Sequence, residues 1–394
     1  MSHLFAGREQ LENNSYDLSP YRPAYHPALV VRKKKAIARW AQIAGAGMVL
    51  IFAVAGYTGW RSLSEVNQIY AMQKALTQPA ATPSEVTLKT DVSGKTNLLL
   101  LGVAGGSNRG ADLTDMMAIL QIDKTTNKTS YVVLPRQLVV RAPSPYYGEW
   151  QALNTVYAAG KYTYLGKADA NSSDPLAKQA GFAAITAVTK ELTGIEIQYT
   201  VVVDYAAFSH AIDSVGGVTV SSPKRINDWP LMKQYGKDWV VAQRGDQTMS
   251  GKQALLYART FAGADEATRE PQRVERQLQL VKAYASRLSS AGLLKNPQSF
   301  GDVVSSFGAS FYSDMKPGES VLTAKIFLGA PMRFSGFVLY DTADALSPFK
   351  KVETSRNEQI EPKAGRGNYA EVQQLVLTRL NAGVPTGKEF AILE

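Results

Sequence analysis

Cysteine is absent from this chain of 394 residues, and histidine occurs only three times. Without cysteine the chain has no disulfide, no thiolate metal site and no cysteine nucleophile. The histidines, His3, His26 and His210, are far apart in the sequence, so they predict neither a histidine-rich metal cluster nor a Ser-His-Asp apparatus. The chemistry of an active site therefore has to come mainly from arginine and carboxylate side chains.

Basic residues are in excess. Lys and Arg outnumber Asp and Glu by 43 to 34, which gives a net charge of +9 and a pI near 9.4. This surplus suits a polyanionic partner such as nucleic acid, an anionic membrane or a phosphate-bearing substrate. Residues 1–40 hold seven basic and three acidic residues, a net of +4, in a polar segment with no sustained helical or strand period. We predict a disordered, basic cytoplasmic tail.

A long uncharged run follows this tail. No charged residue occurs from Ala41 to Gly59, and Trp40 and Trp60 flank the run. Its length matches the ~20 residues that cross ~30 Å of hydrocarbon, and indole rings are typical of both interfaces. We predict one transmembrane helix over 41–60, with a buried helix of a soluble protein as the alternative. The basic cluster before it predicts a single-pass cell-membrane protein with a cytoplasmic N-terminus and an extracytoplasmic domain, which excludes nucleic acid as partner.

Composition also sets the other boundaries. We predict a stalk with a Pro/Ala/Thr linker over 61–95, a catalytic domain over 96–384 and a short tail over 385–394. Strand-like runs occur at 97–103, 116–122, 131–134, 199–203 and 218–221, and helical patterns at 179–192, 204–215, 250–257, 271–288 and 369–380. Their alternation predicts a helix-covered sheet, hence an α/β fold. The polar composition of 161–178 predicts a loop.

Arginines lie close to the ends of these predicted elements, where ligands usually bind in α/β sheets. Arg136 follows one strand and Arg259 ends one helix, while Arg273 and Gln277 are one turn apart on another helix, with Arg276 beside them. Planar guanidinium groups bind phosphate oxygens bidentately, so several in one pocket would suit a pyrophosphate. Each of them is equally compatible with a solvated or salt-bridged surface position.

Three carboxylates are candidates for a hard cation. Mg²⁺ needs one or two carboxylates and shares the phosphates of its substrate. Asp112 and Asp115 come from the loop that also holds Arg109, and Glu270 lies at a helix start. Asp112 is also explained as a residue that pins the turn, and Glu270 by the helix dipole. Spacing alone leaves these alternatives open.

Eight segments of this chain, in this order and behind such an anchor, resemble the LytR-CpsA-Psr family of bacterial envelope proteins. They are NLLLLGV (97–103), LTDMMAILQID (113–123), VVLPR (132–136), LNTVYAAG (153–160), ELTGIEIQYTVVVDYAAFSHAIDSVGGV (191–218), MSGKQALLYAR (249–259), RVERQ (273–277) and EPKAGRGNYAEVQQLV (361–376). The resemblance implies a three-layer α-β-α sandwich with a mixed sheet. It also implies a phosphotransferase that moves a glycopolymer from an undecaprenyl-pyrophosphate carrier to a peptidoglycan acceptor, using Mg²⁺ or Mn²⁺, with the lipid tail in an apolar tunnel.

Site residues follow from the same resemblance, position by position. It implies catalytic or pyrophosphate-binding roles for Arg136, Arg259, Arg273 and Gln277 and a metal-linked role for Asp115. The full set that we expect adds Arg109, Arg276, Asn154 and Tyr157 for the substrate and Asp112 and Glu270 for the metal.

Several positions depart from the family pattern. Ala104 and Gln137 stand where the family has aspartate, and Leu113 and Phe261 where it has arginine; Glu270-Pro271 replaces Asp-Phe. These departures keep two rivals open. One is a hydrolase of the polyprenyl pyrophosphate with water as nucleophile, and the other is a non-catalytic envelope-binding or regulatory module of the same fold.

Overall fold

The computed structural model describes residues 86–106, 110–126, 128–169, 172, 174–229, 240–262, 269–290, 311–316, 318–320, 322–323, 333–340, 347–353 and 358–382. All of them belong to the second of the two units into which the chain divides, Ala38–Glu394. The predicted tail 1–40, transmembrane helix 41–60 and C-terminal tail 385–394 lie outside the described residues, as does most of the predicted stalk. Within the described part of the chain, no helix has both the length and the apolarity needed to cross a membrane.

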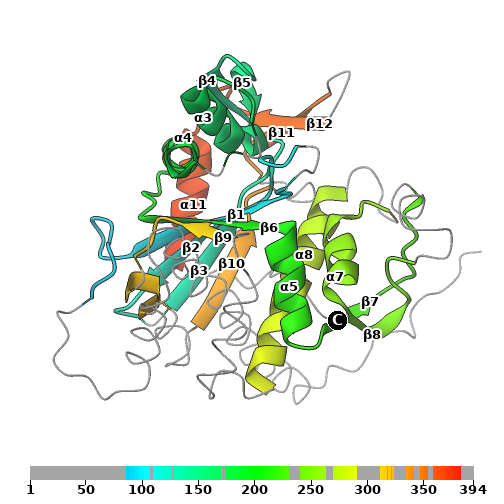
Figure 1. Ribbon diagram of the computed structural model, residues 1–394. Helices are drawn as coiled ribbons and strands as arrows, with labels where there is room; N and C mark the ends of the chain where they lie inside the picture. The colour runs from blue at the N-terminus through cyan, green and yellow to red at the C-terminus, as the bar shows by residue number, and fades with distance from the viewer. Residues whose placement is uncertain are drawn as a thin grey trace, which may run out of the picture. The chain divides into compact units, whose positions relative to one another are not determined.

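A six-stranded mixed sheet forms the centre of the described fold (Figure 1). Its strands, in spatial order, are β10 (Arg333–Val338), β3 (Lys128–Val133), β2 (Thr114–Asp123), β1 (Thr96–Val103), β6 (Tyr199–Asp204) and β9 (Phe311–Ser313). The pairs β1–β6 and β3–β10 are parallel, whereas β1–β2, β2–β3 and β6–β9 are antiparallel. The strands predicted at 97–103, 116–122, 131–134 and 199–203 are confirmed.

Central strand β1 shows why these runs are nearly continuous in apolar residues. Leu98 and Leu100 belong to one buried hydrophobic cluster, while Leu99 and Leu101 belong to another. Successive side chains of a strand point to opposite faces, so a strand buried on both sides needs apolar residues at every position. The sheet therefore requires a covering layer on each face.

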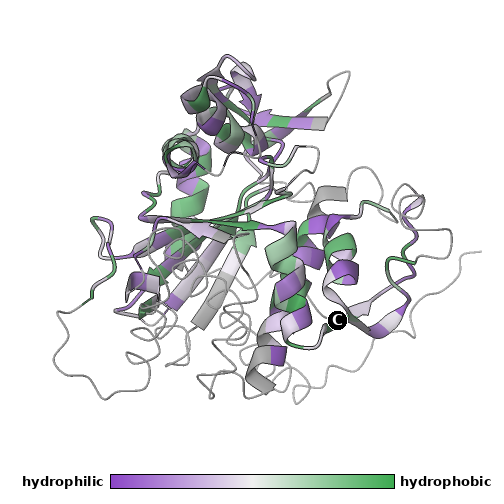
Figure 2. Ribbon diagram, in the orientation of Figure 1, coloured by the Kyte–Doolittle hydropathy of each residue, from purple (hydrophilic) through white to green (hydrophobic). Residues whose placement is uncertain are grey.

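Helices supply both layers (Figure 1). The face of Leu99 packs against α3 (Val156–Leu165), α4 (Pro175–Thr193) and α11 (Ala370–Ala382), and the face of Leu98 against α5 (Tyr205–Ser214), α7 (Gly251–Arg259) and α8 (Arg269–Ser290). Helices α5 and α8 carry both hydrophobic and hydrophilic residues along their length (Figure 2), as expected when one side is buried and the other is solvated. This is the predicted α/β fold, with helices on both faces of a mixed sheet.

The helix on which several candidate arginines depend, α7, begins at a defined signal. The hydroxyl of Ser250 accepts from the amide of Gln253, and the Gln253 side chain accepts from the amide of Ser250, which makes a capping box. The next residue, Gly251, packs so closely on α5 that a Cβ there would lie 2.1 Å from the carbonyl oxygen of Ser209. The short helix predicted at 250–257 is thus confirmed and is pinned against α5.

Three hairpins lie outside the main sheet. They are β4 (Val139–Ser144) with β5 (Gly148–Ala152), β7 (Val218–Ser222) with β8 (Gly245–Met249), and β11 (Phe349–Glu353) with β12 (Glu358–Pro362); a short 3₁₀ turn, η1 (Leu153–Thr155), links β5 to α3. The loop predicted over 161–178 is wrong at both ends, because α3 continues to Leu165 and α4 begins at Pro175. Lys161, at the start of this segment, is buried in α3 and paired with Asp112.

Candidate functional site

Asp115 occupies an unusual place at the start of β2. Gly102 of β1 pairs with Met116 and Val103 pairs with Thr114, so Asp115 is the extra residue of a β-bulge. A bulge breaks the alternation of side chains and re-aims the one that it adds. The backbone thus turns a carboxylate to the edge of the sheet at which β1 and β6 end.

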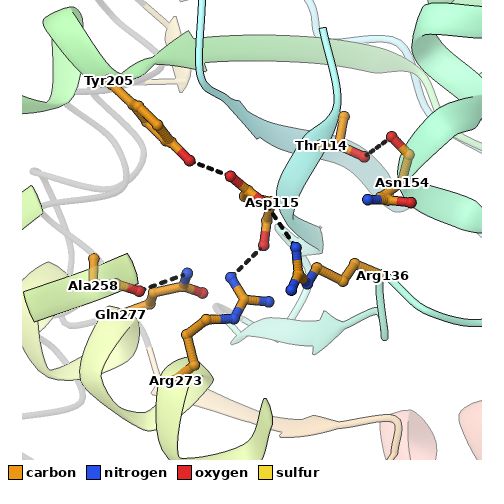
Figure 3. Close-up of polar contacts among 8 residues, drawn as sticks. All are labelled: Thr114, Asp115, Arg136, Asn154, Tyr205, Ala258, Arg273 and Gln277. Atoms are coloured by element: carbon orange, nitrogen blue, oxygen red, sulfur yellow. Dashed lines mark hydrogen bonds and ion pairs between the residues drawn. The ribbon is translucent and has the colours of Figure 1, made fainter. Parts of the chain in front are cut away.

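Arg136 reaches this carboxylate from the neighbouring strand. Strand β3 ends at Val133, and Pro135 then directs the chain away from the sheet. One guanidinium nitrogen of Arg136 donates to an oxygen of Asp115 at 2.8 Å, with both side chains partly exposed (Figure 3). The two residues form a charge-assisted hydrogen bond, which fixes the direction of the guanidinium.

Tyr205 binds the other oxygen of the same carboxylate (Figure 3). It is the first residue of α5 and directly follows Asp204, which ends β6 and caps the helix by accepting from the amide of Ala207 at 2.8 Å. Burial and the charge of Asp115 raise the pKa of the Tyr205 hydroxyl, so it stays protonated and donates. Both oxygens of Asp115 are therefore oriented by protein donors.

Helix α8 adds Arg273 and Gln277 from the opposite side (Figure 3). Arg273 is 4% exposed, and its guanidinium donates to the backbone carbonyl of Asp115 at 2.7 Å. The amide of Gln277 donates to the carbonyl oxygen of Ala258 near the end of α7 at 3.3 Å. The sequence prediction that these residues share a helix face holds, and the structure brings them to Asp115 and to the end of α7.

Aromatic rings line the same place. The guanidinium carbon of Arg259 lies 4.5 Å from the ring centroid of Tyr205. The ring of Phe261 has Arg136 at 5.5 Å and Arg273 at 5.7 Å, both measured from guanidinium carbon to centroid. These distances are within the range of cation–π contacts. Three arginines that are far apart in the sequence are thus brought together around Asp115, Tyr205 and Phe261.

Arg276 plays a different part from its neighbours. It is 6% exposed and donates to the carbonyl oxygens of Tyr257, at 2.9 Å, and of Thr260. Burial lowers the pKa of its guanidinium. Because these carbonyls belong to the last turn of α7, Arg276 ties that turn to α8, and its predicted contact with substrate stays a prediction.

Two residues predicted for the substrate lie around η1. The backbone carbonyl of Asn154 accepts from the hydroxyl of Thr114 at 3.2 Å (Figure 3). The backbone N–H of Asn154 donates to the backbone carbonyl of Arg136 at 3.0 Å. The Asn154 backbone thus links the side chain of Thr114 to the backbone of Arg136. Tyr157 is 3% exposed in the core beside Phe182, and burial raises the pKa of its hydroxyl. Its burial is explained by packing between α3 and α4.

A buried ion pair lies three residues before Asp115. The ammonium of Lys161 lies 2.9 Å from a carboxylate oxygen of Asp112, with side-chain exposures of 2% and 9%. Burial raises the pKa of Asp112, while the charge of Lys161 opposes this shift. Asp112, predicted as a metal ligand, is therefore held by a lysine in this structure.

The remaining predicted residues and the metal can be tested only in part. Arg109 and the side chain of Glu270 lie outside the described residues. Among the described residues, no three acidic or histidine side chains group together as a metal site. Asp115 nevertheless fits the chemistry of Mg²⁺, which is usually held by one or two carboxylates and completed by substrate phosphates.

Sequence reasoning missed Tyr205, Phe261 and Lys161. A signal exists for Tyr205, because it directly follows the strand-ending Asp204 at the edge where the arginines were expected. The sequence offers no comparable signal that Phe261 contacts two arginines or that Lys161 pairs with Asp112, since each pairing joins distant parts of the chain.

Comparisons with known proteins agree with the family resemblance of the sequence. A family model described as the LytR_cpsA_psr family matches residues 62–325. The chain is 23% identical, over 300 residues, to the polyisoprenyl-teichoic acid–peptidoglycan teichoic acid transferase TagT of Bacillus subtilis, covering 74% of this chain and 82% of that protein. Its fold is similar to that of protein gbs0355 from Streptococcus agalactiae (TM-score 0.53, 19% identity, 73% of this chain and 88% of the other). It is also similar to a structure of TagT bound to LI-WTA (TM-score 0.50, 16% identity, 74% and 92%).

Proposed function

This chain belongs to the LytR-CpsA-Psr family, and from that membership and the geometry around Asp115 we propose that it is a membrane-anchored phosphotransferase. It takes a glycopolymer linked to a polyprenyl pyrophosphate, of the undecaprenyl type, and attaches it to peptidoglycan. The transmembrane helix over 41–60 anchors it with the N-terminus in the cytoplasm and the domain over 96–384 outside. The name of the relative TagT supports a teichoic acid or a similar anionic glycopolymer as donor.

One observation carries this proposal: Arg136 and Arg273 converge on Asp115, and Arg259 joins them through Tyr205. A pyrophosphate diester carries two negative charges; several guanidinium groups at one place match that charge, and each planar guanidinium can bind two phosphate oxygens at once. Guanidinium groups donate several N–H groups in a fixed planar fork that suits phosphate oxygens. The cluster therefore binds the diphosphate and orients it.

The reaction is a displacement at phosphorus. A hydroxyl of the acceptor glycan attacks the phosphorus linked to the glycopolymer, a new P–O bond forms, and the bridging P–O bond breaks to release the polyprenyl phosphate. Negative charge grows on the leaving phosphate, and the fixed guanidinium groups of Arg136, Arg259 and Arg273 stabilise it. The proton of the attacking hydroxyl passes to a carboxylate of the site, for which the sequence offers Asp115 and Glu270.

A divalent cation, Mg²⁺ or Mn²⁺, completes the proposal. Asp115 would hold it together with the phosphates, and the ion would neutralise phosphate charge when bound. Val274 and Leu278 of α8 pack against Ala118, Val133 and Val338 as buried core, so the apolar tunnel for the lipid stays a prediction of the family resemblance.

The test uses the full chain in detergent or nanodiscs with a lipid-linked glycopolymer, with and without peptidoglycan. We expect attachment of the glycopolymer only with the acceptor, and a loss of at least about 100-fold in the Arg136→Ala variant. Arg141→Ala is the matched control, because this arginine pairs with Glu149 on the exposed hairpin β4–β5. Phosphate release that needs no acceptor would indicate a hydrolase. An unchanged Arg136→Ala variant would reject the arginine mechanism and favour a binding module.

A further inference from the structure

Phe261 is the one residue described here whose ring contacts two of the clustered arginines. It lies two residues beyond the end of α7 and is half-buried. The guanidinium carbons of Arg136 and Arg273 lie 5.5 and 5.7 Å from its ring centroid. Arg136 comes from the end of β3 and Arg273 from α8, so the ring joins two elements on opposite sides of the cluster.

This arrangement places two like charges, the guanidinium groups of Arg136 and Arg273, near the same ring. Two guanidinium groups within 6 Å of one ring repel each other, and each belongs to a long side chain with many rotamers. The negative face of an aromatic ring attracts both cations and so offsets part of their repulsion. Asp115 contacts the same two arginines, Arg136 through its carboxylate at 2.8 Å and Arg273 through its backbone carbonyl at 2.7 Å.

We propose that Phe261 is a positioning residue: its ring holds Arg136 and Arg273 in the orientation that binds the diphosphate, and so sets the affinity of the site for pyrophosphate. This inference rests on the proposed function, because it takes the arginine cluster as the anion site. Ordering long arginine side chains before binding removes an entropic cost that otherwise weakens the complex. Phe261 acts through the arginines and does not touch the reacting atoms.

Substitutions that change the charge on the face of the Phe261 ring, but hardly its shape, distinguish this positioning role from simple packing. Full-length protein is prepared with Phe261 as wild type, Phe261→Leu, Phe261→Tyr, and with mono-, di- and trifluorinated phenylalanine at this position. Fluorine withdraws charge from the ring face with little change in shape, so it weakens a cation–π contact and leaves apolar packing nearly unchanged. Trp150→Leu is the control, since Arg366 lies 6.0 Å from that ring in another part of the fold.

Calorimetry with inorganic pyrophosphate at fixed ionic strength is the measurement. We expect Phe261→Leu to bind about 10-fold more weakly, Phe261→Tyr to stay within about 3-fold of wild type, and affinity to fall stepwise with each fluorine. Trp150→Leu should bind as wild type does. A flat fluorine series, or Phe261→Leu equal to wild type, overturns the inference.

A second readout needs no ligand. The side-chain N–H signals of Arg136 and Arg273 carry a ring-current shift in the wild type that disappears in Phe261→Leu if the ring holds them. If wild type fails to bind pyrophosphate while this shift is present, the proposed function fails and the aromatic contact stands. If wild type binds pyrophosphate and the shift is absent, the inference on Phe261 fails alone.

Discussion

Asp115 and Arg136 form an ion pair of 2.8 Å between the extra residue of a β-bulge and the residue that follows Pro135. Neither partner belongs to the regular ladder of its strand, so the pair depends on two local departures from a regular sheet. Tyr205 holds the second carboxylate oxygen, and Arg273 holds the backbone carbonyl of the same residue. Asp115 thus organises the donors that the proposed reaction requires.

Replacing the Asp115 carboxylate should lower the activity strongly and change the stability only slightly. Asp115→Asn keeps the shape of the side chain but removes its charge, and we expect glycopolymer transfer to fall at least about 100-fold because Arg136 loses its orientation. The pair is partly exposed, at 21% and 29%, so the free energy of unfolding should change by less than about 1 kcal/mol. A transfer assay and urea denaturation measure the two effects, with Glu149→Gln as control. Full activity in Asp115→Asn would contradict the role given to this residue.

Gly105 and Gly106 offer a matched pair of substitutions. Both have a positive φ, of 66° and 57°, but a Cβ on Gly105 would lie 2.5 Å from the Cβ of Asp204, whereas nothing lies within 4 Å of one on Gly106. Gly106→Ala should cost about 1 kcal/mol of stability from backbone strain alone. Gly105→Ala should cost more than about 2 kcal/mol, since it also displaces the cap of α5. Thermal unfolding compares them; equal losses would show that the contact with Asp204 is easily relieved.

The buried pair Asp112–Lys161 predicts a large effect with a defined pH dependence. Lys161→Met leaves Asp112 buried without its cation, so we expect a loss of about 3–5 kcal/mol at neutral pH. Burial already raises the pKa of Asp112 above its ordinary 3.8, so the folded state binds this proton more tightly than the unfolded state. The contribution of Asp112 to stability therefore falls as pH rises from about 3.8 through its folded pKa.

In Lys161→Met the pH range over which Asp112 loses its contribution to stability extends to higher pH, because removal of the cation raises the folded pKa of Asp112 further. The cost of the substitution should consequently shrink as the pH is lowered towards the ordinary pKa of 3.8, because protonation removes the buried charge of Asp112. Urea denaturation between pH 4 and 8 measures this trend. Lys167→Met is the control, since Lys167 pairs with Asp169 at the surface. A cost that does not depend on pH would contradict a charged Asp112 as its origin.

Arg276 should behave as a structural residue although it lies beside Arg273. Arg276→Met removes the donors of two carbonyl oxygens at the end of α7, and we expect a loss of about 2–4 kcal/mol because buried carbonyls lose their partners. Arg136→Met, from a partly exposed position, should lose less than about 1 kcal/mol. Chemical denaturation of both variants decides this, and equal losses would reject the distinction.

Much of the fold could be predicted from local signals. The apolar runs of β1, β2, β3 and β6 and the caps of α5 and α7 are properties of short segments, so they can be read without knowing the partners of each segment. The hairpins β4–β5 and β11–β12 escaped prediction because their strands are short and half exposed. The polar composition of 161–178 predicted a loop where α3 continues, although Lys161 is buried there against Asp112, a partner that local composition does not reveal.

The sequence by itself determined that this protein has an α/β fold with a helix-covered sheet, and it singled out Arg136, Arg259, Arg273 and Asp115 as candidates for the site. Only the tertiary structure decided that Asp115 sits in a bulge, that Phe261 contacts two arginines, that Arg276 ties α7 to α8, and that Lys161 pairs with Asp112. Periodicity and capping act within a few residues of chain, whereas each of these contacts joins side chains whose distance is set by strand register and helix packing.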